Sequence, residues 1–568
     1  MAASEAMFEA ATHGRGLDGG GPVGFYKVVR TAFGPRFLGF LGITYFGLKG
    51  VANTLVRTAF LPWLQKMGAS GTDYQLATVI ALVPWSTKGA VGTLSDCVPL
   101  GRYHKRGYML ASAVIGAMGL CALVSLQPDS LGPTSVWSVA TLFCCVHLMI
   151  SSFDLLCEGK YAEVMREEHT GTEVVTLIWF FIQMGSLVGA GMTGIFVDAE
   201  GPRPLVAACL PLAALAVWRT HAGDLPERPA RGWRAMRLKV LSEPQLFILA
   251  IGMAVGSLMV ALSAAFMGQD GRALVALGVS GGLSWYSFKA LPRTLACSNF
   301  YMFLISVAYL DLSGPLAYFY TGRHGCIQDA PHFSYSYYLA VSNFVGSVGA
   351  ALGAVLFQSM QRWSFRSVFV VTTCAQVIAS LFDLLIIQRW NIAMGMTDEA
   401  AYLLGDAACQ NIASQMALMP QVVLTARLCP RGAEATVYAI LAGFQNFGAS
   451  VGSVLGARLC DAFGVVASQE GPCDFGNLTK LVILAHIIAP MACVPLTFWL
   501  VPAARVDDET AFEETSPPPS FCSPASSSPA SSAPPSPISP ILGWHEAAVD
   551  GEYLLMVDDG AGAIRQIS

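Results

Sequence analysis

The sequence predicts an all-α polytopic membrane protein with two related six-helix bundles, an extra helix pair between them, about 14 spans and both termini cytoplasmic. The first observation is composition: of 568 residues, 54% are hydrophobic and only 12% are charged, whereas a soluble domain carries about twice that charged fraction. The second is that the apolar residues fall into about fourteen stretches of bilayer-spanning length, without the alternating segments of a barrel. The third is an internal repeat.

Each expected helix is centred on one apolar stretch. The centres lie near residues 50, 84, 116, 146, 185, 211, 257, 281, 308, 345, 377, 413, 446 and 490. Lys and Arg gather in short cytoplasmic loops of membrane proteins and therefore indicate orientation. Here they follow the second, sixth, eighth, tenth and twelfth helices: Arg102, Lys105 and Arg106; Arg228, Arg231, Arg234, Arg237 and Lys239; Lys289 and Arg293; Arg362 and Arg366; Arg427 and Arg431. All five loops are expected on the cytoplasmic side.

These assignments divide the chain into five segments. They are a cytoplasmic N-terminal tail (1–36), an N-terminal six-helix bundle (37–220), a cytoplasmic loop with the inserted helix pair (221–293), a C-terminal six-helix bundle (294–502) and a cytoplasmic tail (503–568). The last segment is Pro/Ser-rich over 516–540 and cannot build a core, so it is expected to be disordered.

Composition also excludes several functions. A net charge of −5 gives no basic surface for nucleic acid. The 15 cysteines show no paired CxxC spacing, so no metal site is expected. Neither HExxH nor GxSxG occurs, and no cofactor motif is visible, so the protein is not expected to be an enzyme.

The first spanning stretch, about residues 37 to 64, carries Tyr45, Lys49, Asn53 and Arg57 at four-residue spacing. On an α-helix these side chains share one face. Charge at membrane depth is costly unless it faces protein or water. The stripe therefore predicts the wall of a cavity that accepts an anionic or strongly polar solute.

Two pairs of segments recur at an offset of about 260 residues. The segment Val91–Asp96 resembles Leu352–Leu356, and each is followed by basic residues. The segment from Gly171 to Asp198, with Gln183, Gly185 and Gly189, recurs from Gly432 to Asp461, with Gln445, Gly448 and Gly452. Parallel repeats of this kind are typical of transporters whose substrate site lies between the halves near mid-membrane.

The spacing of Gly92, Leu94 and Asp96 before a basic loop resembles the signature of the major facilitator superfamily. The resemblance implies that Asp96 and Arg106 lock a cytoplasmic gate. The alternative is an ordinary solvated basic loop.

A more specific resemblance covers residues 36 to 502. Ordered motifs are similar to those of the folate–biopterin transporter family, in particular its protozoan branch: Asp154–Glu163 (DLLCEGKYAE), Val83–Lys88 (VPWSTK), Phe319–Thr321 (FYT), Pro331–Tyr335 (PHFSY), Arg389–Asn391 (RWN) and Leu428–Glu434 (LCPRGAE). Cys157 stands where Thr is expected. The family includes transporters of folates, of unconjugated pteridines and of S-adenosylmethionine, so the resemblance implies the class better than the ligand.

The fourth helix places Asp154 and Glu158 on one face. Asp154 can accept hydrogen bonds from a pterin or can hold a proton; alternatively, both carboxylates pair with Lys88 or Arg57 and hold helices together. We assign Glu158 and Lys160, nearer the cytoplasm, to the gate.

Further candidates extend the substrate site. Lys88 lies three residues after Trp85, so a cation and an aromatic ring share a face, and Trp179 and Gln183 do the same in the fifth helix. The alternative for both tryptophans is ordinary core or lipid-belt packing. Asp311 precedes a Gly-Pro break, Gly314-Pro315, and is the preferred proton-coupling carboxylate together with Asp154.

The sequence therefore predicts a carrier of folate or pteridines such as biopterin, working by alternating access, coupled to protons, monomeric and in the plasma membrane. One alternative is an S-adenosylmethionine transporter. Another is a non-transporting membrane receptor or scaffold. On the non-cytoplasmic side, Cys326 and Cys473 are a candidate disulfide, with two unpaired thiols as the alternative, and Asn477 begins a glycosylation sequon.

Overall fold

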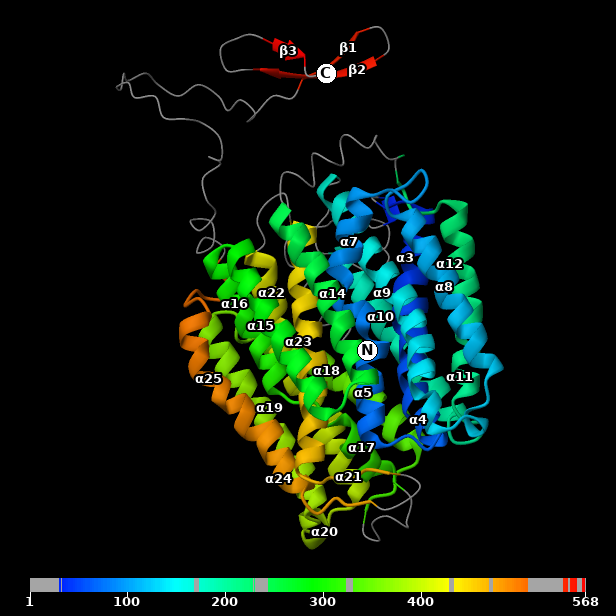
Figure 1. The fold of residues 1–568 in the computed structure, drawn as a ribbon, viewed down its shortest axis with the longest axis vertical. Helices are drawn as coiled ribbons and strands as arrows, with labels where there is room; N and C mark the ends of the chain where they lie inside the picture. Colours follow the sequence, from blue (N-terminus) through cyan, green and yellow to red (C-terminus); the bar gives the residue numbers. More distant parts are fainter. Residues whose placement is uncertain are drawn as a thin grey trace, which may run out of the picture. The chain divides into compact units, whose positions relative to one another are not determined.

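A computed structural model of the chain describes residues 30–31, 33–167, 173–227, 229, 244–322, 330–428, 434–468 and 473–508, and three strands at 545–549, 552–558 and 564–566. The chain divides into two compact units, Met1–Ser516 and Pro517–Ser568. The first unit is a helical bundle (Figure 1).

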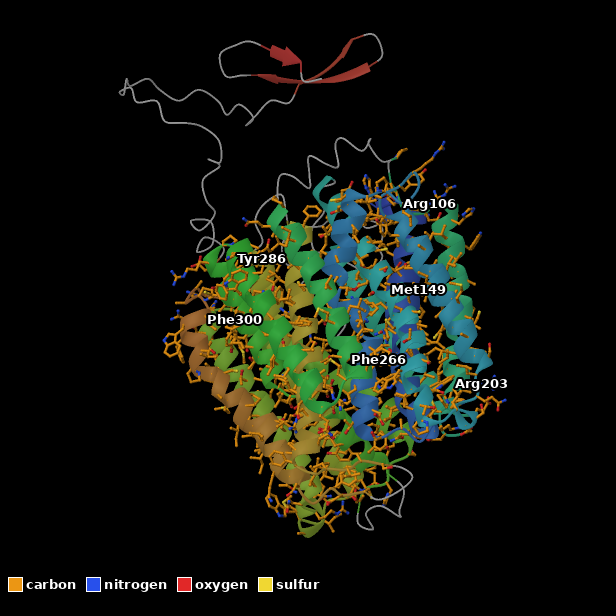
Figure 2. All side chains as sticks on the ribbon, viewed as in Figure 1. Arg106, Met149, Arg203, Phe266, Tyr286 and Phe300 are labelled. Atoms are coloured by element: carbon orange, nitrogen blue, oxygen red, sulfur yellow. The ribbon has the colours of Figure 1, made fainter. Side chains whose placement is uncertain are left out.

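The N-terminal half of the bundle contains the first six helical rods. Their elements are α3 (Pro35–Gly42), η1 (Ile43–Ala52), α4 (Asn53–Lys66), α5 (Gly71–Ala81), α6 (Val83–Ser86), α7 (Lys88–Cys97), α8 (Arg106–Ser125), α9 (Val136–Glu167), α10 (Glu173–Phe196), α11 (Arg203–Ala207) and α12 (Cys209–Ala222), with short 3₁₀ turns η2 (Pro128–Ser130) and η3 (Pro133–Ser135). Arg106 and Arg203 lie at opposite ends of this half (Figure 2).

The C-terminal half follows a helix pair, α14 (Pro244–Phe266) and α15 (Gln269–Ala290). Its elements are α16 (Arg293–Ala308), α17 (Ser313–Thr321), η4 (Ser336–Val341), α18 (Ser342–Gln358), α19 (Phe365–Ile387), α20 (Trp390–Ala393), α21 (Asp398–Tyr402), η5 (Leu403–Cys409), α22 (Gln410–Leu428), α23 (Glu434–Ala462), α24 (Leu478–Val482), η6 (Ile483–Ile488) and α25 (Ala489–Leu500). The pair α14–α15 packs against α23, and α14 also contacts α5 and α7.

Every expected helix centre lies inside a helix of the structure. Within the described ranges, nine helices are long and apolar enough to cross a membrane. The rods over 35–66, 71–97, 269–290, 398–428 and 434–462 are not among these nine. All of them except 269–290 line the polar cavity described below, which explains the lower hydropathy of those four. Fourteen spans and cytoplasmic termini stay predictions.

The two halves pack in the same way. In the first, η1 packs against α10, and α8 packs against α9 and α12; in the second, α16 packs against α23, and α19 packs against α22 and α25. The repeated glycines explain the closest of these contacts. A Cβ on Gly185 would lie 2.8 Å from the Cα of Gly50, and one on Gly448 would lie 3.0 Å from the Cβ of Ser306.

The second unit contains an antiparallel sheet in the order β1-β2-β3, formed by His545–Val549, Glu552–Asp558 and Ile564–Gln566. The sequence predicted disorder throughout 503–568, so these strands differ from the expectation. The difference is one of composition, because β2 (EYLLMVD) has the apolar and aromatic residues that favour strands, whereas 516–540 has Pro and Ser.

Cys473 is disulfide-bonded. Its predicted partner, Cys326, lies outside the described residues. The sequon residue Asn477 precedes α24, and its side-chain amide donates a hydrogen bond to the Phe463 carbonyl at 2.9 Å.

Candidate functional site

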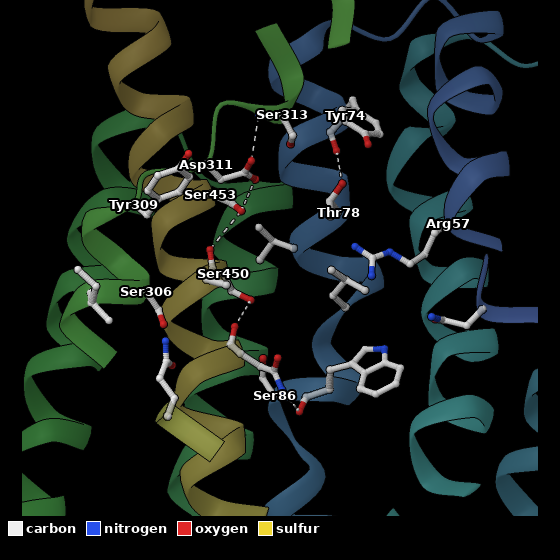
Figure 3. A pocket seen from close by; sticks show the side chains of 18 of the residues that line it. Arg57, Tyr74, Thr78, Ser86, Ser306, Tyr309, Asp311, Ser313, Ser450 and Ser453 are labelled. Carbon is white, nitrogen blue, oxygen red and sulfur yellow. Dashed lines mark hydrogen bonds between the residues drawn. The ribbon is translucent and has the colours of Figure 1, made fainter. Parts of the chain in front are cut away.

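A cavity of about 740 Å³ lies between the two halves of the bundle. Its lining comes from the first two rods, from α16, α17 and the break between them, and from α19, α22 and α23 (Figure 3). The lining residues are Lys49, Asn53, Arg57, Tyr74, Thr78, Val79, Leu82, Trp85, Ser86, Ile305, Ser306, Tyr309, Asp311, Ser313, Gln376, Gln421, Asn446, Ala449, Ser450 and Ser453. The size falls within the range of about 300–1,000 Å³ that is usual for small-molecule sites.

Three of the four residues in the predicted stripe line this cavity: Lys49, Asn53 and Arg57. Tyr45 instead is buried, and its hydroxyl donates to the backbone carbonyl of Asp154 at 3.3 Å. Lys49 Nζ lies 5.8 Å from the centroid of the Tyr45 ring, so the two side chains still share a face. Tyr45 lies one turn beyond the cavity, where its ring packs against Tyr161 of α9 with 6.2 Å between centroids.

Asp154 is at the centre of a buried charge cluster behind the cavity wall. Its carboxylate pairs with Lys49 Nζ at 2.7 Å and with Lys88 Nζ at 2.5 Å. The Asp154 side chain is 3% exposed, whereas that of Lys49 is 24% exposed. Of this cluster only Lys49 lines the cavity, so its charge is the one that a solute can reach.

The predicted aromatic residues separate into two places. Trp85 lines the cavity, its indole donates to His147 Nδ1 at 3.2 Å, and Lys88 Nζ lies 4.4 Å from its ring centroid. Trp179 is 41% exposed and lies 6.0 Å from Lys49 Nζ, outside the cavity lining. Gln183 also lies on α10 outside this lining.

Arg57 is the cation most available to a solute. It is exposed, and its guanidinium points into the cavity (Figure 3). Among the described residues it has no ion-pair or hydrogen-bond partner, in contrast to Lys49. A charged guanidinium at this depth favours an anionic group or a carbonyl oxygen of a bound solute.

Asp311 lies on the opposite wall, at the predicted interruption of the helix. The interruption is confirmed, since α16 ends at Ala308 and α17 begins at Ser313. One Asp311 carboxylate oxygen accepts from the Ser453 hydroxyl at 2.6 Å, and the other accepts from the Ser313 backbone N–H at 2.8 Å.

The broken segment also joins the two halves. Gln75 Nε2 of α5 donates to the carbonyls of Asp311 at 2.6 Å and Ser453 at 2.8 Å. The Gly314 backbone N–H donates back to Gln75 Oε1 at 3.3 Å. Nearby, the Tyr318 hydroxyl donates to the Ala69 carbonyl at 2.5 Å. These bonds hold the halves together at the end of the cavity that is predicted to be non-cytoplasmic.

The lining includes polar residues that the sequence analysis missed. Asn446, Ser450 and Ser453 follow the i, i+4, i+7 spacing of one face of α23. Tyr74 and Thr78 do the same on α5. The spacing was visible in the sequence, but uncharged polar residues carry a much weaker signal at membrane depth than Lys or Asp.

The predicted gate residues lie toward the end of the bundle that the sequence predicts to be cytoplasmic. Asp96 pairs with Lys105 at 3.7 Å. The Arg106 guanidinium contacts the His221 carbonyl, and its backbone N–H donates to Glu227 at 3.0 Å. Lys160 pairs with Glu163 at 2.9 Å, and Glu158 lies one turn from Asp154 in α9.

Solved transporters share this fold. A POT family transporter in complex with a thioalcohol-conjugated peptide aligns with a TM-score of 0.58 at 12% identity, covering 82% of this chain and 95% of its own. The D-xylose–proton symporter aligns with a TM-score of 0.52 at 13% identity, covering 84% and 98%. These alignments show the fold, which is a polytopic all-helical fold of the major-facilitator type, with two helix bundles around a central polar cavity.

The family follows from the sequence comparison. The BT1 family matches residues 49–519, and the chain belongs to it. It is therefore a multi-pass integral membrane protein of a transporter family, not of an enzyme family. "Probable folate-biopterin transporter 2" of Arabidopsis thaliana is 24% identical over 495 residues, covering 85% of this chain and 86% of its own. The "Folate-biopterin transporter" of Synechocystis sp. is 26% identical over 461 residues, covering 78% and 77%.

Proposed function

We propose that the protein transports folates or unconjugated pteridines such as biopterin across the plasma membrane by alternating access, coupled to protons and as a monomer. Membership of the BT1 family supports this, as do relatives named folate-biopterin transporters. The placement in the protozoan branch is part of the proposal, since these relatives come from a plant and a cyanobacterium.

The observation that carries the proposal is the Arg57 guanidinium, which lines a polar cavity between the halves and has no ion-pair partner in the part of the chain that the structure describes. A folate carries carboxylates on its glutamate, and a pterin carries a ring carbonyl; either can accept from Arg57. The Trp85 indole lies on the same wall, where a flat heterocycle can stack. Asn446 and Ser450 opposite offer donors and acceptors for the ring edge.

Charge also separates the substrate candidates. Asp154 is a single carboxylate shared by Lys49 and Lys88, so it does not neutralise both, and Arg57 has no ion-pair partner within the described residues. A cationic sulfonium would meet this charge unfavourably, which supports folate or pteridine over S-adenosylmethionine.

Uptake in a heterologous cell tests the proposal. Labelled folate, biopterin and S-adenosylmethionine are compared at neutral and acidic pH, and we expect folate or biopterin to accumulate faster at acidic external pH. Accumulation of S-adenosylmethionine alone would support the alternative carrier. No accumulation of any of the three, with the protein at the surface, would favour a receptor or scaffold.

Site variants sharpen the same assay. Lys49→Ala and Asp311→Asn are each expected to abolish uptake, because one removes a cation from the wall and the other removes the carboxylate that holds Ser453. Asp129→Asn, at an exposed position in η2, serves as the control. Wild-type uptake in both site variants, at equal surface abundance, would place the substrate elsewhere.

A further inference from the structure

A second group of ionisable side chains lies in the C-terminal half, outside the cavity lining. It consists of Asp383 on α19, Asp406 in η5 and His486 in η6. Asp383 is 4% exposed and His486 is 5% exposed. The carboxyl group of Asp406 lies close enough to that of Asp383 for the two to interact. Two ionised carboxylates in contact, away from water, repel each other strongly, so such a pair favours the binding of a proton.

The remaining contacts leave the pair without a compensating cation. The Tyr320 hydroxyl donates to Asp383 Oδ1 at 2.8 Å. The other ionisable side chains that face the pair are the tyrosines Tyr309, Tyr338 and Tyr402. Within the described ranges, no lysine or arginine is ion-paired with either carboxylate. This differs from Asp154, which has two lysine partners.

His486 provides an unfilled proton position beside the pair. Its Nε2 lies 3.1 Å from the Leu310 carbonyl, which only accepts, so Nε2 carries the hydrogen. In the neutral ring Nδ1 then has a bare lone pair. Nδ1 lies 3.7 Å from Asp383 Oδ2, and it has no hydrogen-bond partner within the described part of the chain. Two acceptors thus face each other, and one added proton would turn this contact into a hydrogen bond.

The backbone at these positions is unusual. Asp406 and His486 both lie in π-helical segments, Leu403–Cys409 and Ile483–Ile488. Such segments are rare and are frequently found at functional sites. Lys49, which lines the cavity, lies in a third one.

Two direct contacts connect this group to the cavity. The ring of Tyr309, which lines the cavity, stacks on His486 with 4.5 Å between centroids. The Leu310 carbonyl is hydrogen-bonded to His486, and the carbonyl of the next residue, Asp311, accepts a hydrogen bond from Gln75 of the other half. A change at His486 therefore acts on the segment that joins the halves.

We propose that Asp383, Asp406 and His486 form a proton-binding site, and that the helix break at Tyr309–Leu312 couples its occupancy to the contact between the halves. The coupling to transport rests on the proposed function. The step is the addition of one proton to His486 Nδ1 from the aqueous phase, which neutralises the buried pair's remaining negative charge. Asp311 then acts on the cavity side of the break and not as the principal proton carrier.

The first test needs no substrate. Infrared spectra of the purified full-length protein are recorded between pH 5 and pH 9, and the band of protonated carboxylic acids is followed. We expect a titrating band in the wild type that is lost in the double variant Asp383→Asn/Asp406→Asn and kept in Asp129→Asn. An unchanged band in a folded double variant would overturn the proposal. If the double variant does not fold, Asp383→Asn and Asp406→Asn are measured separately. Each should shift the pH at which the band titrates, and an unshifted band in both would overturn the proposal.

The second test measures coupling in proteoliposomes. The ratio of uptake with an inward proton gradient to uptake without one should fall toward one in Asp406→Asn and in His486→Gln, where Gln can still donate to Leu310. Asp129→Asn should keep the wild-type ratio. A wild-type ratio in both site variants would overturn the coupling. If the wild type transports neither folate nor biopterin while the infrared band behaves as expected, the substrate proposal fails and the proton site stands.

Discussion

The two halves of the bundle use different chemistry at corresponding contacts. In the N-terminal half, the first and fourth rods are joined by a charged pair, Lys49–Asp154, at 2.7 Å. In the C-terminal half, the end of α16 and the start of α22 are joined by a neutral hydrogen bond of the same length, between Gln410 and the Tyr309 hydroxyl. The members of the two pairs are separated by about 260 residues, as the internal repeat requires. Sequence duplication has therefore preserved the packing and changed the charge.

The difference assigns the halves different tasks. Asp154 lies between two lysines and is ion-paired with both, so it fixes the shape and charge of the cavity wall. In the other half the carboxylates of Asp383 and Asp406 lie one turn or less from the neutral contact and lack such partners within the described residues. A carboxyl pair of this kind gains or loses a proton more readily than a carboxylate held by two cations. In the proposed mechanism, the N-terminal half therefore contacts the charge of the substrate, and the C-terminal half binds the proton.

The largest effect is expected from removing the centre of the charged cluster. Asp154→Ala would leave Lys49 and Lys88 close together and without a counter-charge, and breaking a buried ion pair costs about 3–5 kcal/mol. We expect strong loss of folded protein, measured by thermal unfolding in detergent and by size-exclusion chromatography. Asp406→Asn should lose clearly less stability, because it leaves no unpaired cation. Equal stability of the two variants would show that the halves do not differ in this way.

Removing the Arg57 guanidinium from the cavity wall should have the next largest effect. Hydrogen bonds to charged groups contribute about 1.5–3 kcal/mol, so Arg57→Gln should weaken substrate binding about 10- to 100-fold. The concentration dependence of folate or biopterin uptake measures this change. Arg458→Gln, which alters a pair with the largely exposed Asp270, is the matched control and should leave the affinity unchanged. An unaltered affinity in Arg57→Gln would remove Arg57 from the substrate site.

Sequence patterns predicted the helices well but the site only in part. Apolar length places a helix because every backbone group in the membrane must be satisfied within it. Lys49 and Arg57 were found because charge at this depth is rare. The spacing grouped Tyr45 with Lys49 correctly, but it does not show where along that face the cavity ends, and Tyr45 lies outside the lining. The contact between Asp383 and His486 was not predicted, because the two residues lie on rods far apart in sequence and no spacing within one helix connects them.

The smallest effect concerns the neutral contact itself. Tyr309→Phe keeps a ring to stack on His486 and removes only the hydroxyl, which contacts Ser380 at 2.8 Å and Gln410 at 2.7 Å. A neutral hydrogen bond contributes about 0.5–1.5 kcal/mol, so the loss of both bonds should lower stability by about 1–3 kcal/mol. The pH dependence of uptake should move further than in Tyr301→Phe, which removes a buried hydroxyl of α16 that accepts from Thr497 at 2.9 Å, because the Tyr309 hydroxyl positions the ring that covers the proton site. If the two variants shift the pH dependence equally, Tyr309 contributes only packing, and the connection from the proton site to the cavity must run through the Leu310 carbonyl alone.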